Sequence, residues 1–519
     1  MAAVVAVVVT LALGGCSADG GASDESSETA TAVEPQSGGV LRVIESSVIA
    51  GLDPVQASYP TTTPLSYSAI YGNFLVPDPE TGEYECGLCE SFETSDNGAT
   101  WDISLRDGIT FSDGTPFDAE AVKYNWERIK DPANGASASL GFAQQIDTIE
   151  VVDDLTLRLT MTELNPGFKS QFTTYVLQWI ASPTALAKGT EEFNKNPIGA
   201  GPFLFESWTQ GGVLRVVRNP DYYDAPRPYL DAMEIQGVAD TTQRVNALLA
   251  GSADLIMDTT PSDFATAEAS GFVVSKYTFN GGQAFMMNMS KPPFDDIRAR
   301  QALAYALDLD AISDAATGGY PAVPSTLFNE SSPLYADIPL ATYDPEKAQE
   351  LFDELAAEGN PLEFTYTLFP TQSSQATFEA LQAQLGEYDN VTVVADQRDG
   401  SEAGTIAPSG DFQMLPWSLT FADPIGRLWG ALHSEAGTTN YTHIADPALD
   451  AALDAANVAG DDDEELAKQF EIVQERLAEL VPYIIYGELY TGTISSDKVN
   501  GIELYGFTTP QASGLWLTQ

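Results

Sequence analysis

The chain has no long apolar run after residues 1–15, so the sequence predicts no membrane-spanning helix in its body. Histidine and cysteine are also rare, with two and three residues among 519. A structural zinc site needs four ligands, and His433 and His443 lie far in sequence from Cys86 and Cys89. The sequence therefore predicts neither a metal site nor a cofactor.

Basic residues are scarce as well. The chain has 23 Lys and Arg residues against 75 Asp and Glu, a formal net charge of −52. This charge excludes nucleic acid as a partner, because phosphates require the opposite sign. It is compatible with steering of cationic ligands, and equally with a generally acidic surface that has no bearing on the binding site.

The amino-terminal segment predicts export. Ala2 to Leu13 form an apolar run of signal-peptide length, and Leu13-Gly14-Gly15-Cys16 resembles a bacterial lipobox in which the Cys16 thiol takes a lipid. No Lys or Arg precedes the run, which favours a start upstream of Met1. Residues 1–16 are thus predicted to be a signal peptide, and the polar residues 17–36 a flexible tether outside the cytoplasmic membrane.

Cys86 and Cys89 could form a redox pair, half a zinc site or a local disulfide. Glu85 and Glu90 flank the pair and disfavour the thiolate that redox chemistry needs. An extracytoplasmic location favours a structural disulfide.

The body alternates strand and helix patterns, which indicates α/β layers. Thr100–Arg106 alternates apolar and polar residues, Asp118 can cap a helix through Val122 and Trp126, and Asp344-Pro345 resembles a helix start. The segment Phe412–Trp417 is predicted to be a strand that approaches a loop at Trp417.

Several segments, in the same order, resemble the family 5 extracellular solute-binding proteins, the oligopeptide-, dipeptide- and nickel-binding lipoproteins of ABC transporters. The segments are Leu105–Phe117, Pro197–Phe203, Arg218–Tyr223, Pro293–Arg298, Arg300–Ala306, Tyr343–Ala348 and Asp423-Pro424. Their Gly, Pro and Asp residues suit turns, and none supplies catalytic chemistry, so we expect a receptor and not an enzyme.

The resemblance implies a two-lobed α/β periplasmic-binding-protein-like fold (type II, large variant) with an extra α+β domain inserted in the first lobe. Lobe I would comprise 37–70, 197–280 and 490–519, the inserted domain 71–196, and lobe II 281–489. The lobes would close by a hinge motion around a small peptide or peptide-like ligand and present it to ABC permease subunits.

The resemblance also implies a ligand site, with one departure. In peptide-binding members an Asp three residues after the tryptophan equivalent to Trp417 binds the ligand's ammonium, and here that position is Thr420. The nearest carboxylate, Asp423, can also start a helix. A capped or cyclic peptide, a glycoside or an opine-like conjugate would therefore fit. Further candidates for ligand contact are Trp417, Tyr59, Asn440 and Tyr441.

Two other functions remain open at this point. A nickel chelate could be bound with help from His433 or His443, as in the nickel branch of the family. A secreted hydrolase would need a nucleophile with a base or two facing carboxylates, and no Gly-x-Ser-x-Gly or His-Glu-x-x-His motif is present.

Overall fold

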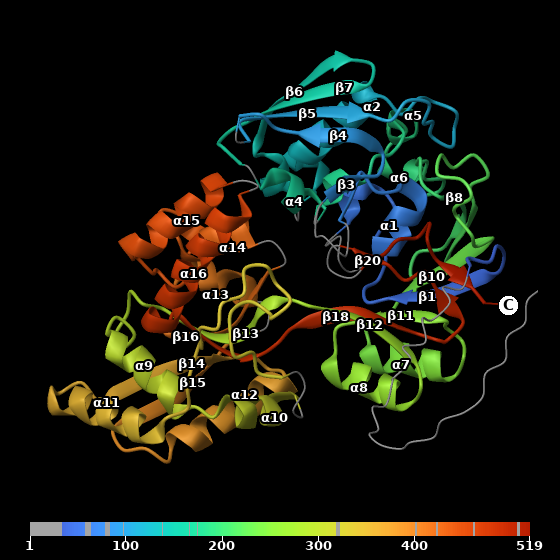
Figure 1. Ribbon diagram of the computed structural model, residues 1–519. Coiled ribbons are helices and arrows are strands. Elements are labelled where there is room, and N and C mark those ends of the chain that lie inside the picture. Colours follow the sequence, from blue (N-terminus) through green and yellow to red (C-terminus); the bar gives the residue numbers. More distant parts are fainter. Residues whose placement is uncertain are drawn as a thin grey trace, which may run out of the picture. The chain divides into compact units, whose positions relative to one another are not determined.

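Figure 1 shows the computed structural model, which describes residues 34–519 apart from short stretches. The stretches left out are 58–63, 78–83, 97, 137–138, 166, 174, 318–321, 400–401, 422–423, 460–461, 506–508 and 519. The predicted signal peptide with Cys16, most of the tether, Tyr59 and Asp423 lie outside the described residues.

A seven-stranded mixed sheet forms the centre of the first lobe, in the order β12-β18-β11-β1-β10-β9-β8. Its strands are β1 (Val40–Glu45), β8 (Phe203–Trp208), β9 (Leu214–Arg218), β10 (Ala232–Gly237), β11 (Leu255–Asp258), β12 (Val273–Thr278) and β18 (Tyr490–Ser495). β1 is parallel to both of its neighbours, β10 and β11. Their carboxyl ends therefore meet at one edge, where ligands bind in open α/β sheets.

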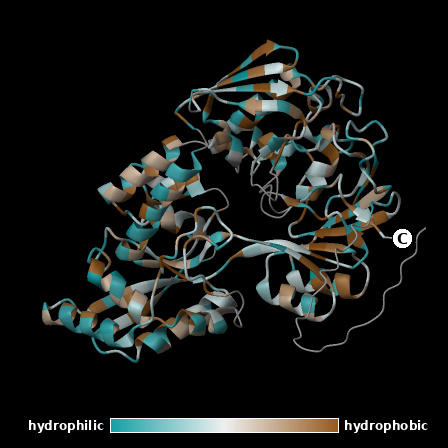
Figure 2. Cartoon of the chain, viewed as in Figure 1, coloured by the Kyte–Doolittle hydropathy of each residue, from teal (hydrophilic) through white to brown (hydrophobic). Residues whose placement is uncertain are grey.

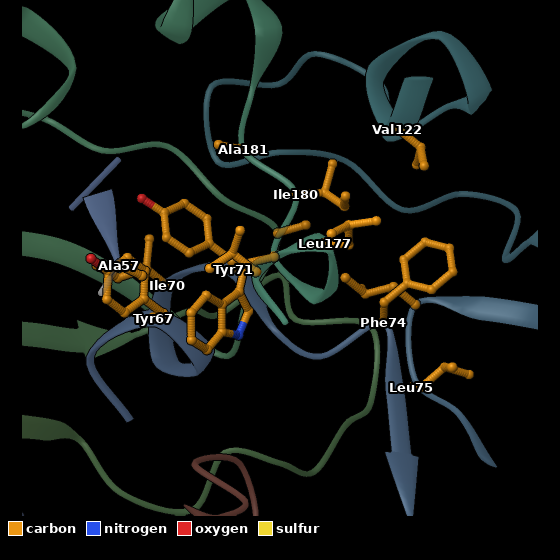
Figure 3. Close-up of a cluster of buried hydrophobic side chains, with 14 of the residues drawn as sticks. Ala57, Tyr67, Ile70, Tyr71, Phe74, Leu75, Val122, Leu177, Ile180 and Ala181 are labelled. Carbon is orange, nitrogen blue, oxygen red and sulfur yellow. The ribbon is translucent and has the colours of Figure 1, made fainter. Parts of the chain in front are cut away.

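Alternation along the strands places two cores on opposite faces of this sheet. Leu41 and Val43 of β1 belong to the larger core, which also includes α1 (Pro64–Tyr71), whereas Ile44 faces a smaller one under α7 (Thr241–Leu249) and α8 (Pro261–Ala269). Figure 3 shows part of the larger core, where Tyr67 and Tyr71 lie near Leu177 and Ile180.

The inserted α+β domain shares this larger core. It contains a four-stranded sheet in the order β4-β5-β7-β6. Its elements are β4 (Cys89–Glu93), β5 (Thr100–Leu105), α2 (Ala119–Lys130), α3 (Leu140–Ala143), β6 (Ile146–Asp153), β7 (Thr156–Met161), α4 (Phe168–Phe172), α5 (Pro183–Leu186) and α6 (Thr190–Phe193). Asp118 caps α2 as predicted, because its side chain accepts the Ala121 N–H at 2.9 Å. Buried Trp101 and Trp126 lie in the same continuous core as β1.

A five-stranded sheet in the order β15-β14-β16-β13-β17 forms the second lobe. Its strands are β13 (Asn280–Met287), β14 (Leu362–Leu368), β15 (Val391–Gln397), β16 (Met414–Phe421) and β17 (Tyr483–Gly487). The helices around it are α9 (Ile297–Ala306), α10 (Leu309–Thr317), α11 (Pro345–Ala357), α12 (Gln372–Leu385), α13 (Ala403–Ser409), α14 (Pro424–Leu432), α15 (Pro447–Ala459) and α16 (Asp463–Leu480).

Helices cover both faces of this second sheet. Phe285 and Met287 of β13 pack with α9 to α12, whereas Ala284 and Met286 pack with α13 to α16. Figure 2 shows the resulting pattern, with hydrophobic colour on strands and hydrophilic colour over much of the helices. The predicted two-lobed α/β fold with an inserted α+β domain is confirmed.

One predicted element has different bounds. β16 begins at Met414 and continues without a break to Phe421, so Trp417 lies inside a strand and not at the approach to a loop. Pro416 lies inside this strand. A proline fits because β14 pairs with β16 only at Met414 and leaves the outer edge of β16 unpaired beyond it.

Candidate functional site between the lobes

Two crossing segments connect the two sheets. β12 leads into β13 through Phe279, and β17 leads into β18 through Glu488 and Leu489. The segments lie side by side, because the Phe279 N–H donates to the Leu489 carbonyl at 2.9 Å. Two short adjacent connections allow rotation of one sheet against the other while each sheet stays intact.

A segment of the second lobe binds both connections. The Glu488 N–H donates to the Ala322 carbonyl at 2.9 Å, and the Gly281 N–H donates to the Leu327 carbonyl at 2.8 Å. The Asn329 amide donates to the Thr278 carbonyl at 3.2 Å. These bonds fix the backbone at the crossing, so rotation has to occur within very few residues.

Glu45 ends β1 at the carboxyl edge of the first sheet, and its side chain is fully buried. Its carboxylate accepts the Leu65 N–H at 2.8 Å, the Ser66 N–H at 3.1 Å and the Ser66 hydroxyl. It thus satisfies donors in the first turn of α1. Burial raises the pKa of Glu45 to about 7, and the bonds from Ser66 and Leu65 oppose that shift.

Substitution of Glu45 by Gln should remove a pH dependence of stability. Folded Glu45 keeps its proton up to about pH 7, whereas the ordinary pKa is 4.5, so the folded state binds more protons between these values. The stability that this proton provides is complete below pH 4.5 and is lost as pH rises through 7. We therefore compare the unfolding free energy of the wild type with that of Glu45→Gln at each pH. The wild-type value minus the variant value should fall by on the order of 3 kcal/mol between about pH 4 and 8. Urea unfolding of both proteins across this range measures the difference, and parallel curves would contradict it.

Trp417 and Tyr441 meet in the second lobe. Their rings are in edge contact, with centroids 5.2 Å apart. The Thr420 hydroxyl lies 3.0 Å from the Ser418 hydroxyl on the same strand. The Thr420 side chain therefore takes part in a neutral hydrogen bond at the position where peptide-binding relatives were expected to have a carboxylate.

Asn440 has a different environment from the one expected of a ligand contact. Its amide nitrogen donates to the carbonyls of His433 and Ile444 at 3.1 and 2.9 Å, and its oxygen accepts the Thr442 hydroxyl at 2.9 Å. The residue is buried. These contacts give Asn440 a structural role in the turn between α14 and α15.

Arg427 lies near the same group, and the sequence did not single it out. It is an exposed residue of α14, and it donates to the carbonyls of Ser418 and Thr420 at 3.1 and 3.4 Å. Burial raises the pKa of Tyr483 and of Tyr175, and the positive charge of Arg427 opposes both shifts. Tyr175 belongs to the inserted domain, so Arg427 lies where the two parts approach each other.

A second contact supports this approach. A Cβ on Gly426 would lie 2.4 Å from the Gln171 Nε2 of α4, so α14 lies close to the inserted domain at this residue. One sequence signal could have identified Arg427. In a chain with few basic residues, a cation in the first turn of a helix just after the Trp417 strand is unusual, because the helix dipole disfavours it.

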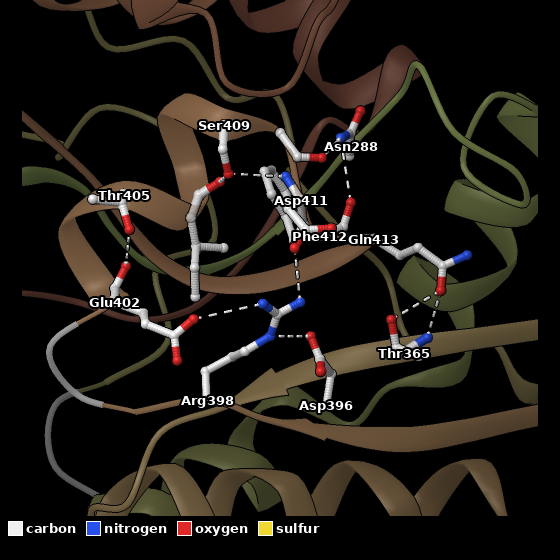
Figure 4. A network of polar contacts seen from close by, with 12 residues as sticks. Asn288, Thr365, Asp396, Arg398, Glu402, Thr405, Ser409, Asp411, Phe412 and Gln413 are labelled. Carbon is white, nitrogen blue, oxygen red and sulfur yellow. Dashed lines mark hydrogen bonds and ion pairs between the residues drawn. The ribbon is translucent and has the colours of Figure 1, made fainter.

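Arg398 directly follows β15, and its charged partners differ from the partners of Arg427 (Figure 4). It lies in the segment between β15 and β16. Its guanidinium contacts Asp396 and Asp411 at 2.8 and 3.0 Å and Glu402 at 3.7 Å. This charge is neutralised by three carboxylates, so Arg398 holds the segment together and offers little to a ligand.

The two histidines considered for a nickel chelate, His433 and His443, lie in different environments, and His443 is exposed. His433 is buried, its Nδ1 accepts the Glu435 N–H at 3.0 Å, and its Nε2 lies 3.2 Å from Asp454. In the described part of the chain, no group of three or more His, Cys, Asp or Glu side chains could hold a metal ion. Cys86 and Cys89 form a disulfide.

The two described cavities of ≈ 390 Å³ lie away from these residues. One is a groove beside α2, lined by residues that include Tyr124 and Pro183. The other lies beside the disulfide, with Arg106 and Tyr223 in its wall. Neither has Trp417, Thr420 or Tyr441 in its lining. Among the described helices, none combines the length and apolar character needed to cross a bilayer.

Comparison with known proteins identifies relatives of this chain. The family model described as "Bacterial extracellular solute-binding proteins, family 5 Middle" matches residues 83–439. The glutathione-binding protein GsiB of Shigella flexneri is 32% identical over 334 residues, which cover 61% of this chain and 62% of GsiB. The chain thus matches about three fifths of the length of this curated relative.

Solved structures share the fold over almost the whole chain. HbpA2 from Haemophilus parasuis has a TM-score of 0.81 at 23% identity, with 93% of this chain and 100% of that chain covered. AgaA from A. tumefaciens R10, solved with agropinic acid, has a TM-score of 0.70 at 25% identity, with 93% and 99% covered.

Proposed function

Because the chain belongs to the bacterial extracellular solute-binding proteins of family 5, we propose that it binds a peptide-like solute between its lobes and delivers it to an ABC importer. The observation that carries this proposal is the pair of adjacent crossing segments, joined by the Phe279–Leu489 hydrogen bond, beside a group of aromatic and polar side chains. This geometry suits closure around a ligand.

The predicted lobe boundaries form part of this proposal. The crossing residues 279 and 488–489 support a first lobe of 37–70, 197–280 and 490–519 and a second of 281–489, with 71–196 as the inserted domain. We further propose that the chain is exported and anchored by a lipid on Cys16. Mass spectrometry of the amino-terminal peptide from membrane fractions tests the anchor.

An opine-like conjugate is the second candidate ligand. AgaA was solved with agropinic acid, and Thr420 removes the carboxylate expected for an ordinary peptide ammonium. A buried ammonium without a charged partner would be strongly disfavoured, whereas a blocked amine needs none.

A thermal-shift screen of the purified protein tests the proposal. The compounds are glutathione, dipeptides to pentapeptides, opines, glycosides and Ni²⁺. A compound at one hundred times its dissociation constant should stabilise the protein by about 2.7 kcal/mol. Stabilisation by glutathione, peptides or opines supports the proposal. Stabilisation by Ni²⁺ alone, or turnover of a tested compound, would count against it.

A further inference from the structure

Nearly all arginines of this acidic protein lie beside carboxylates. Across the described ranges, the exceptions without a carboxylate within ion-pair distance are Arg106, Arg300 and Arg427. Arg300 is buried and donates to the carbonyls of Leu480 and Phe294, and Arg106 donates to those of Cys86 and Gly87. Arg427 alone among these three is exposed next to the candidate site.

Helix stability does not explain the position of Arg427. It is in the first turn of α14, where a cation interacts unfavourably with the helix dipole. Its place is fixed instead by β16. The carbonyls of Ser418 and Thr420 point to the edge of β16 that has no strand partner, and both accept from Arg427.

These two bonds occupy one edge of the guanidinium and leave another free. Nε and Nη2 donate to the strand. A guanidinium has five N–H groups, so both N–H groups of Nη1 and one of Nη2 make no hydrogen bond to the residues that the structure describes. The free pair at the end of the fork has the geometry that binds a carboxylate through two parallel hydrogen bonds.

The surroundings suit a carboxylate of a bound solute. Arg427 lies within electrostatic reach of Tyr175 and Tyr483, and the neighbouring Gly426 is in close contact with α4. An anion bound at this place would face groups of the inserted domain and of the second lobe. The net charge of −52 disfavours anions at long range, so a local cation is needed to retain one.

On the basis of the proposed function, we propose that Arg427 binds a free carboxylate of the solute, and that the solute's amine is not bound by a carboxylate at position 420. The ligand class is then a peptide-like acid, with a free terminal carboxylate and an amine that is blocked, side-linked or bound elsewhere. Thr420 contributes only the neutral hydrogen bond described above.

The test compares two ligand mixtures on four proteins. One mixture contains tripeptides, including glutathione, with free carboxyl ends, and the other contains the same compounds as carboxamides. The proteins are the wild type, Arg427→Gln, Arg427→Lys and the control Lys468→Gln. Lys468 is an exposed residue of α16 that pairs with Glu465, so its substitution removes the same charge from the second lobe without touching the site. Calorimetric titration gives the apparent affinity for each mixture.

We expect the wild type and Lys468→Gln to bind the free acids at least about 30-fold more tightly than the amides, because the amides lose the charge-assisted hydrogen bonds to Arg427. In Arg427→Gln this ratio should fall to about one, and Arg427→Lys should lie between, because a lysine cannot form the fork. If Arg427 has only a structural role, Arg427→Gln will bind both mixtures more weakly by the same factor. The ratio of the two affinities would then be preserved, which would overturn the inference. Equal binding of acids and amides by the wild type would overturn it too, while leaving the proposed function intact. Binding of neither mixture by the folded wild type would refute the peptide-like ligand class itself.

Discussion

Replacement of Gly281 by alanine should lower the unfolding free energy by about 4 kcal/mol, an exceptional value for the addition of one methyl group. Gly281 has a φ of +72°, and an added Cβ would lie 1.8 Å from the Leu419 carbonyl oxygen and 3.3 Å from the Phe421 ring. Because Gly281 pairs with Thr420 in the sheet, relief of this clash must separate β13 from β16 at the hinge. Ligand binding should be lost together with stability.

Gly271 provides the matched control. Its φ is +83°, and a Cβ there would meet nothing within 4 Å. Gly271→Ala therefore carries the left-handed backbone penalty of about 1–2 kcal/mol without the collision. Urea unfolding of both variants, followed by fluorescence, separates the two effects. Equal destabilisation would show that the close approach of β13 and β16 is not the cause.

The second large effect concerns a buried ion pair. Arg244 and Asp258 are 2% and 0% exposed, with Nη2 and Oδ2 3.0 Å apart. Arg244 also donates to the carbonyls of Val238 and Ala239, and the other oxygen of Asp258 accepts the N–H groups of Thr259 and Thr260 at 2.8 Å. Arg244→Met would leave a buried carboxylate without its cation, so stability should fall by about 3–5 kcal/mol.

An exposed pair and a double variant test this explanation. Arg158→Met breaks the contact between Arg158 and Asp102, whose side chains are 50% and 51% exposed. It should destabilise the protein far less than Arg244→Met, because water screens an exposed ion pair. Addition of Asp258→Asn to Arg244→Met should restore part of the loss, because the uncompensated charge is removed. A double variant no more stable than Arg244→Met would show that packing of the arginine, and not its charge, accounts for the effect.

Local chemistry made much of the fold predictable. Asp118 and Asp344 were predicted to start helices, and both cap them, because capping depends on a side chain and the backbone three residues away. The alternation in Thr100–Arg106 predicted a strand, and β5 (Thr100–Leu105) has Trp101 and Ile103 on one buried face. The predicted end of the strand near Trp417 was wrong, because the length of β16 depends on its pairing with β13, which is distant in sequence.

The candidate site was only partly predictable from the sequence, because it too depends on contacts between residues that are distant in the chain. Trp417, Thr420 and Tyr441 were identified through a resemblance, and the structure brings Trp417 and Tyr441 into contact. Asn440 was a candidate in the same way, but its amide nitrogen donates to carbonyls of the turn in which it lies. Whether a polar side chain is available to a ligand depends on partners that are distant in sequence.

The sequence by itself determined the layered α/β class, the helix starts, the excess of acidic residues and the order of family segments, since these follow from short-range pattern and composition. Only the tertiary structure decided which arginines have no carboxylate partner among the described residues, which strand edge stays unpaired there and where the two sheets are connected. Those features depend on contacts between β16, α14, α4 and the crossing segments, which no local pattern encodes. Arg427 became a candidate for carboxylate binding only when its neighbours were known.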